Sequence, residues 1–204
     1  MAKTEHYFVQ FEAGKCYHVY NRSVDRKPMF KNDGNYLYFL KQYDAYVSEV
    51  LDTLVYCLLG NHFHLLVRIK DLDPIRKQTP KLKSKSDHEI VSHQFKRFFQ
   101  SYAMAFNKQH DRIGTLFQTP FKRVEINNDA YFTNMINYIH TNPQIHGMVD
   151  DFRDWPWSSY HSILSYKQTK LKREEVIAFF GSVEDFKKQH HNTIKLPEEL
   201  VIED

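Results

Sequence analysis

The chain has 204 residues, of which 42% are hydrophobic and 15% aromatic. This apolar content is enough for a folded core, so composition excludes a disordered or fibrous chain. The 28 basic and 25 acidic residues leave a formal net charge of +3, which taken alone argues weakly against a nucleic-acid binder. The length slightly exceeds one typical domain and is too short for two large ones.

The cysteine count and the apolar runs predict the compartment. The two cysteines, Cys16 and Cys57, are too few to stabilise a fold of this size and suit a reducing cytoplasm. The N-terminal residues lack the apolar run of a signal peptide. The longest apolar stretch, 54–59, is far shorter than the roughly 20 residues of a membrane helix. We therefore expect a cytoplasmic protein.

The first half of the chain predicts a strand, a helix and a hairpin. The β-rich segment 15–22 (KCYHVYNR) is typical of a strand. Asn32 or Asp33 is a candidate cap for a helix whose apolar residues follow a 3.6-residue period as far as Val50. The apolar runs 54–59 and 62–69 flank Gly60-Asn61, a pair typical of a hairpin turn.

The second half predicts two long helices around a fourth strand. Residues 71–87 are polar and lysine-rich, which indicates a loop. Residues 90–107 carry one apolar stripe and predict an amphipathic helix, and 121–126 (FKRVEI) predicts a strand. Asp129 is a candidate cap for a helix through His140, which Asn142-Pro143 would end.

The element order β-α-β-β-α-β-α indicates the fold class. It is typical of the α+β, ferredoxin-like split βαβ arrangement, an antiparallel sheet with helices on one face. We expect residues 1–151 to form this domain. Residues 152–204 would form a C-terminal helical extension packed on it, with two short helices and an acidic tail at 198–204.

His62, Phe63 and His64 form the most informative triplet. Side chains alternate along a strand, so the two histidines would point to one face and Phe63 to the other. Two imidazoles about 7 Å apart can bind one divalent cation. A solvent-facing strand would also explain an isolated pair, but these histidines lie in an otherwise apolar hairpin and need partners or a ligand. Metal binding is the favoured interpretation.

A catalytic metal site needs further ligands and an open position for substrate. The chain has no CxxC motif, no HExxH motif and no dense carboxylate cluster to supply them. Tyr138 and Asn142 are four residues apart, so a helix through both would place them on one face. Asn142 could give a carbonyl oxygen to the metal, with the Tyr138 phenol presented to a metal-bound electrophile. From the spacing alone, packing of the tyrosine and an ordinary helix end before Pro143 are the favoured explanation of the pair.

Five segments, in order, resemble the REP-associated tyrosine transposases, which are single-tyrosine HUH transposases of the insertion-sequence type. The central one is 55–67 (VYCLLGNHFHLLV), which resembles the His-hydrophobe-His strand of that family. The others are Tyr17-His18-Val19 with Arg22 and Arg26, 114–117 leading to Phe121-Lys122, 138–143 (YIHTNP) and 157–160 (WSSY). Each motif is modest alone, and five in sequence are specific.

The resemblance implies a transposase that cleaves and rejoins single-stranded or hairpin DNA in DNA transposition and recombination. His62 and His64 would hold a divalent metal, Mg or Mn, with Asn142 as a further ligand, although two imidazoles alone would favour Zn, Ni or Cu. Tyr138 would attack the scissile phosphodiester, leaving a 5′-phosphotyrosine and a free 3′-hydroxyl. Such a protein would be nucleoid-associated, and a homodimer is one of its expected forms.

The average charge hides a local basic excess. Residues 68–123 contain 13 basic and 5 acidic residues, a net of +8 that leaves −5 for the rest of the chain. Four lysines crowd the predicted loop: Lys77, Lys81, Lys83 and Lys85. A charge run of this kind is usually a solvated surface, but a basic stripe beside a phosphodiester site is what phosphate neutralisation requires. The candidate DNA-binding residues are Arg22, Arg26, Lys96, Arg97, Lys122 and Arg123.

Two other functions stay open at this point. A domesticated relative would bind hairpin DNA without cleaving it. A metal-dependent phosphodiesterase would use water as the nucleophile. The presence of His62, His64 and Tyr138 together favours the transposase, because a lineage without cleavage would be free to lose any of them.

Overall fold

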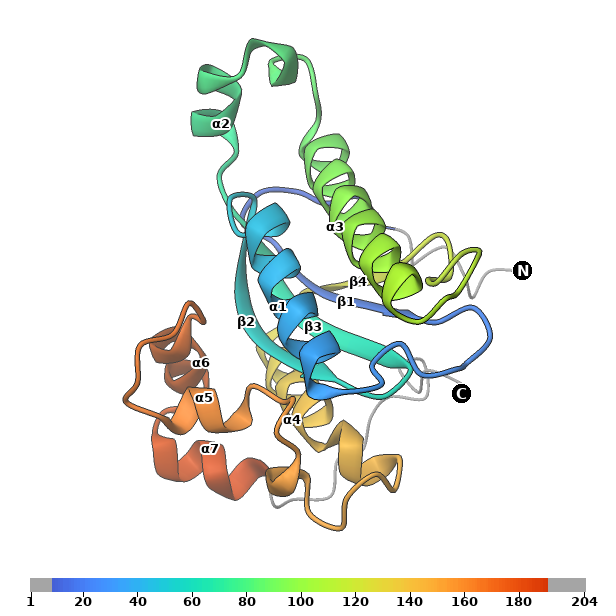
Figure 1. Ribbon diagram of the computed structural model, residues 1–204. Helices are drawn as coiled ribbons and strands as arrows, with labels where there is room; N and C mark the ends of the chain where they lie inside the picture. The colour runs from blue at the N-terminus through green and yellow to red at the C-terminus, as the bar shows by residue number, and fades with distance from the viewer. Residues whose placement is uncertain (1–8, 191–204) are drawn as a thin grey trace, which may run out of the picture.

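Four strands form one antiparallel sheet in the order β2-β3-β1-β4 (Figure 1). They are β1 (Cys16–Arg22), β2 (Leu51–Leu58), β3 (His62–Ile69) and β4 (Lys122–Ile126). This computed structural model describes residues 9–190. The strand order and the intervening helices confirm the predicted α+β class with its split βαβ sheet. Within that range, no helix is both long and apolar enough to cross a bilayer.

Two helices, α1 (Asp33–Val47) and α3 (Asp87–Gln109), lie side by side on one face of the sheet (Figure 1). The Asn32 side chain caps α1 by accepting the backbone N–H of Asn35. Ser86 and Glu89 form a capping box at the start of α3. Aromatic side chains from both helices pack on the inward residues of the strands, among them Phe39, Phe95, Phe98, Tyr17, Phe63 and Leu65.

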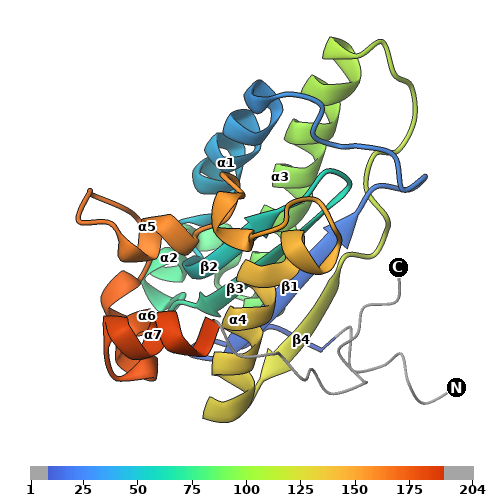
Figure 2. The same ribbon diagram turned by 90° about the horizontal axis from the view of Figure 1, so that it is seen from below.

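The third long helix, α4 (Asp129–Ile145), covers the opposite face of the sheet (Figure 2). This differs from the expected arrangement with the helices on one face. The reason is that the central hairpin is apolar on both sides: Leu54 and Leu66 point away from α1 and α3, and pack with Ile136 and Ile139 of α4. The sheet therefore lies between two apolar cores.

Helix α4 also runs further than predicted. It is capped by Asn128 instead of Asp129, and it passes through Pro143 to Ile145 instead of ending near His140. Proline removes one backbone donor, but Pro143 lies in the last turn, where a single hydrogen bond is lost. The backbone N–H groups of His146 and Met148 bond to the carbonyls of Asn142 and Pro143 and close this end of the helix.

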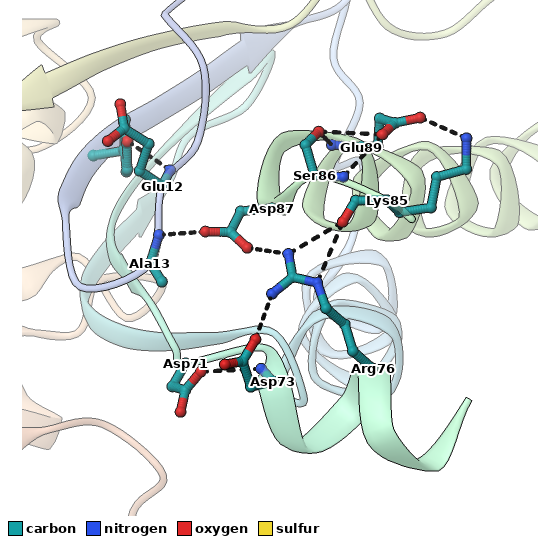
Figure 3. A network of polar contacts seen from close by, with 10 residues as sticks. Glu12, Ala13, Asp71, Asp73, Arg76, Lys85, Ser86, Asp87 and Glu89 are labelled. Carbon is teal, nitrogen blue, oxygen red and sulfur yellow. Dashed lines mark hydrogen bonds and ion pairs between the residues drawn. The ribbon is translucent and has the colours of Figure 1, made fainter. Parts of the chain in front are cut away.

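The predicted loop after β3 contains two short helices, α2 (Asp73–Gln78) and the 3-10 helix η2 (Pro80–Leu82). We call residues 71–86 the arm. Arg76 fastens the arm because its guanidinium bonds to Asp73 at 3.0 Å, to the carbonyl of Lys85 and to Asp87 (Figure 3). The second carboxylate oxygen of Asp87 accepts the Ala13 N–H at 2.8 Å. These contacts make the arm an ordered projection instead of an open loop.

The C-terminal extension packs on α4 and β2. It contains the 3-10 helix η3 (Phe152–Asp154) and three α-helices where two were expected: α5 (Tyr160–Leu164), α6 (Arg173–Phe180) and α7 (Val183–His190). Their apolar side chains, including Tyr160, Val176 and Phe186, complete the core around α4. The predicted acidic tail at 198–204 lies outside the described residues, and the domain division at residue 151 stays a prediction.

Candidate active site

Strand β3 brings His62 and His64 onto the face that α4 covers, while Phe63 enters the opposite core. This is the predicted alternation. The neighbouring strand β1 places a third histidine there, because the antiparallel register sets Tyr20 opposite His64 and His18 opposite Leu66. The Nε2 atom of His18 lies 2.9 Å from Nδ1 of His64. Strand pairing therefore builds a histidine cluster that the triplet alone did not predict.

Helix α4 adds the predicted tyrosine to this cluster and carries the predicted asparagine one turn further on. The Tyr138 ring meets the rings of His64 and His18 edge to face, with centroid distances of 5.5 and 6.3 Å. Asn142, one helical turn further, is fully buried, and neither atom of its side-chain amide has a hydrogen-bond partner among residues 9–190. The same holds for His64 Nε2 and His18 Nδ1. These are four of the five buried side-chain atoms without a partner in the described residues, the fifth being Asn137 Oδ1. Buried polar atoms normally have partners, so this concentration favours a ligand from outside the chain.

His146, at the C-terminal cap of α4, is a site residue that the sequence reasoning missed. Its ring lies 5.1 Å from that of His62, measured between centroids. It falls eight residues after Tyr138, on the same helical face, but the predicted helix end near Pro143 would have removed it from that face. The eight-residue spacing from Tyr138 would have identified His146 if the helix had been predicted to continue through Pro143.

Burial decides the charge of the central histidines. Loss of hydration lowers the pKa of His18 to about 3. Burial, together with the neighbouring His62 and His18, holds the pKa of His64 well below its ordinary value. Both rings are therefore neutral at pH 7, the state in which an imidazole can ligate a metal.

The donors at this site fit a divalent ion with mixed nitrogen and oxygen ligands. Within residues 9–190, no group of three or more His, Cys, Asp or Glu side chains is arranged to hold a metal. The set that the resemblance implies, His62 and His64 with Asn142, contains only two side chains of those types, so this finding does not test it. The unpartnered Nε2 of His64 and Oδ1 of Asn142 are consistent with that set.

A cavity of about 200 Å³ opens beside the two histidines. Its other lining residues are mostly polar or basic: Tyr20, Asn21, Arg22, Arg26, Gln118 and Lys122. A second hollow of about 390 Å³ shares Arg22, Arg26 and His62 with it and reaches His146. The adjoining hollows give the site an open, positively charged side.

The structure divides the six candidate DNA-binding residues into two groups. Arg22, Arg26 and Lys122 line the cavity. Arg123 points the other way along β4, where its Nε donates to the Val9 carbonyl at 2.5 Å and its guanidinium lies over Phe11. Lys96 and Arg97 lie on α3, on the far side of the sheet from the histidines. Only the first group is brought to the site.

The arm carries exposed positive charge of its own. Arg76 and Lys85 are engaged with acidic side chains of the arm and of α3. The exposed lysines Lys77, Lys81 and Lys83 have no ion pair with any acidic residue in the described part of the chain. The internal pairing of the arm therefore leaves its cationic groups available on the outside.

The fold and the site define an α+β protein in which two strand histidines lie beneath a tyrosine and an asparagine of a covering helix. Comparison with known proteins tests the resemblance described above. The chain is 32% identical over 116 residues to a putative REP-associated tyrosine transposase of Haemophilus influenzae, over 54% of this chain and 59% of that protein. It thus spans about three-fifths of that relative's length.

A solved structure of a REP-associated tyrosine transposase bound to a REP hairpin matches with a TM-score of 0.59 and 17% identity, over 80% of this chain and 86% of that one. No family model matches the chain. The resemblance predicted from the five segments is confirmed by these two proteins, and the second shows that the fold is shared.

Proposed function

We propose that this chain is a REP-associated tyrosine transposase that cleaves and rejoins single-stranded or hairpin DNA through Tyr138. The observation that carries the proposal is the contact of the Tyr138 ring with His64, under a helix that also presents the unpartnered amide of Asn142. The name of the similar H. influenzae protein supports the class of enzyme. The similar solved structure is bound to a REP hairpin, which supports hairpin DNA of that kind as the substrate here.

The chemistry follows from the phenol and its neighbours. The Tyr138 oxygen attacks the scissile phosphorus, the bond from phosphorus to the 3′ oxygen breaks, and the phenolic proton is balanced by the proton gained at the 3′-hydroxyl. The resulting 5′-phosphotyrosine conserves a phosphoester, so the reverse attack by a 3′-hydroxyl rejoins DNA without ATP. His18 and His64 orient the phenol through their ring contacts. When bound, a Mg or Mn ion held by His62, His64 and Asn142 supplies positive charge at the phosphate.

The basic side of the cavity suits the same substrate. Arg22, Arg26 and Lys122 would neutralise the phosphates that flank the scissile bond. We place the protein in the cytoplasm with nucleoid DNA, as a monomer or a homodimer.

The test is incubation with Mn and with single-stranded oligonucleotides that carry genomic palindromes, followed by denaturing electrophoresis. We expect a covalent protein–DNA adduct that Tyr138→Phe abolishes, while hairpin affinity changes by less than about 0.5 kcal/mol. Tyr131→Phe is the matched control, because Tyr131 lies on the same helix and outside the histidine cluster. This control should keep full adduct formation.

Each alternative function has its own outcome. Cleavage by the Tyr138→Phe variant without an adduct would establish water as the nucleophile and refute the tyrosine mechanism. Hairpin binding by the wild-type protein with no cleavage in Mn or Mg would establish a binding protein. Replacement of His62 or His64 by alanine should abolish metal-stimulated cleavage in a folded protein.

A further inference from the structure

His18 lies at the centre of the histidine cluster but is not among the proposed ligands. It is 1% exposed, and its ring is nearly parallel to that of His64, with 5.2 Å between centroids and 16° between planes. Tyr20 stacks on it at 4.8 Å. Because β1 is paired on both sides, with β3 and with β4, its backbone fixes this position. This close packing against His64, a candidate metal ligand, suggests that His18 has a role in the site.

That role concerns the proton that His18 and His64 share. The 2.9 Å contact between His18 Nε2 and His64 Nδ1 holds one proton, so one of these nitrogens donates and the other accepts. An imidazole that ligates a metal is neutral, so His64 as a ligand carries only one N–H. If His64 Nδ1 donates, its Nε2 keeps a lone pair. If His18 Nε2 donates, His64 must carry its own proton on Nε2, and that nitrogen cannot ligate a cation. The position of the shared proton therefore decides whether His64 Nε2 can ligate a metal.

The neighbouring histidine is held with its Nδ1 as a donor. Nδ1 of His62 lies 2.6 Å from Oδ1 of Asn61, and the Asn61 amide nitrogen donates to the Arg26 carbonyl at 2.8 Å. That second bond identifies the atom facing His62 as the oxygen, which can only accept. His62 Nδ1 therefore carries a proton, which leaves Nε2 as the ring nitrogen that could act as a ligand. The equivalent arrangement for His64 needs His18 as the acceptor.

We propose that His18 is a positioning residue that fixes His64 in the tautomer with its proton on Nδ1, so that Nε2 faces the site as a lone-pair donor. His18 does for His64 what Asn61 does for His62. A second hydrogen bond of this kind sets the tautomer and ring orientation of a metal-binding histidine. The proposal rests on the proposed function for the identity of the ligand, whereas the tautomer is a property of the metal-free protein.

Two substitutions separate this role from simple packing. His18→Leu fills similar space and leaves His64 Nδ1 without an acceptor, whereas His18→Gln retains an amide oxygen that can accept. The proton positions of His64 are read by long-range ¹⁵N–¹H correlation NMR on the metal-free, histidine-labelled protein, and Mn affinity by calorimetry. His93→Leu is the control, because His93 is exposed on α3.

In the wild-type protein, we expect His64 to carry its proton on Nδ1. His18→Leu should move the proton to Nε2 and weaken Mn binding by about 10- to 100-fold. His18→Gln should retain the Nδ1 proton and most of the affinity, and His93→Leu should change neither. A wild-type His64 protonated on Nε2, or a His18→Leu variant with unaltered tautomer and affinity, would overturn the proposal.

Failure of the proposed function has a different signature. A wild-type protein that binds no Mn while His64 keeps its Nδ1 proton would refute the metal site and leave the role of His18 intact. If His18→Leu does not fold, the glutamine variant decides, because loss of the Nδ1 proton in that folded variant contradicts the role of His18 as acceptor.

Discussion

Replacing Asn142 with leucine should make the protein more stable and less able to bind metal. The Asn142 amide is fully buried, and neither of its polar atoms has a hydrogen-bond partner in the described structure. A buried polar group without a partner costs about 1–3 kcal/mol, and leucine has the same number of side-chain heavy atoms, the same branching and no polar atom. The free energy of unfolding should therefore rise by about 1–3 kcal/mol. For a chain of this length, that corresponds to an increase in Tm of roughly 2–12 °C.

The measurement is urea denaturation in a chelating buffer, paired with calorimetric titration of Mn. Asn128→Ala is the matched control on the same helix, because the Asn128 side chain accepts the Tyr131 N–H at 2.8 Å. Its loss should lower stability by about 0.5–2 kcal/mol and leave Mn affinity unchanged. A destabilised Asn142→Leu variant would contradict the gain in stability expected from removing an unpartnered amide. A stabilised variant with normal Mn affinity would remove Asn142 from the ligand set.

Three further predictions concern the buried polar network, pH and the arm. Ser159→Ala should lower the free energy of unfolding by about 2–5 kcal/mol in urea denaturation, because the Tyr56 N–H and His140 Nε2 both lose their partner. Stability should fall below pH 6.5, because the unfolded chain protonates His18 and His140 while burial lowers their folded-state pKa. Each histidine contributes about 1.4 kcal/mol per pH unit, and equal urea midpoints at pH 7 and pH 5 would contradict this. Replacing the three exposed arm lysines Lys77, Lys81 and Lys83 with alanine should reduce the salt dependence of hairpin affinity. The slope of log affinity against log salt concentration should fall in magnitude by up to about 2.7. An unchanged slope would show that the arm is only a solvated surface.

Local alternation was enough to predict how β3 presents its side chains. The turn at Gly60-Asn61 fixes where β3 begins, and side chains alternate along the strand. Because Phe63 enters the core, His62 and His64 share the other face. The partner of that face could not be predicted in the same way. His18 reaches His64 only because β1 is inserted between β3 and β4, and a contact across 46 residues depends on strand order.

The helix end at Pro143 shows where a local rule gives way to packing. Proline disfavours a helical residue before it, which predicts an end near Asn142. In the structure, Asn142 and Pro143 are both buried residues of α4, and their tertiary packing outweighs the local preference. The error removed His146 from the predicted site, although the positions of Tyr138 and Asn142 on one face were correctly anticipated from their spacing.

A second cluster of buried histidines clarifies what distinguishes the site. His190 Nδ1 donates to the Phe186 carbonyl at 2.7 Å, so its Nε2 accepts from His140 Nδ1 at 2.8 Å. His140 Nε2 then accepts the Ser159 hydroxyl at 2.8 Å, and that hydroxyl oxygen accepts the Tyr56 N–H. Each donor in this series of hydrogen bonds has an acceptor, and the series joins α7 and the start of α5 to α4 and β2.

The two clusters lie on different sides of α4, and the contrast between them separates structure from function. His140 is two residues from Tyr138, so their side chains leave the helix in nearly opposite directions. The satisfied network ties α4 to α7, to the start of α5 and to β2. Across the helix, His18, His64 and Asn142 are equally buried, but retain polar atoms without partners. Four of the five buried side-chain atoms without a partner in the described residues belong to these three residues, the fifth being Asn137 Oδ1. That concentration beside Tyr138, against a bonded network on the other side of α4, favours the proposed ligand at this site.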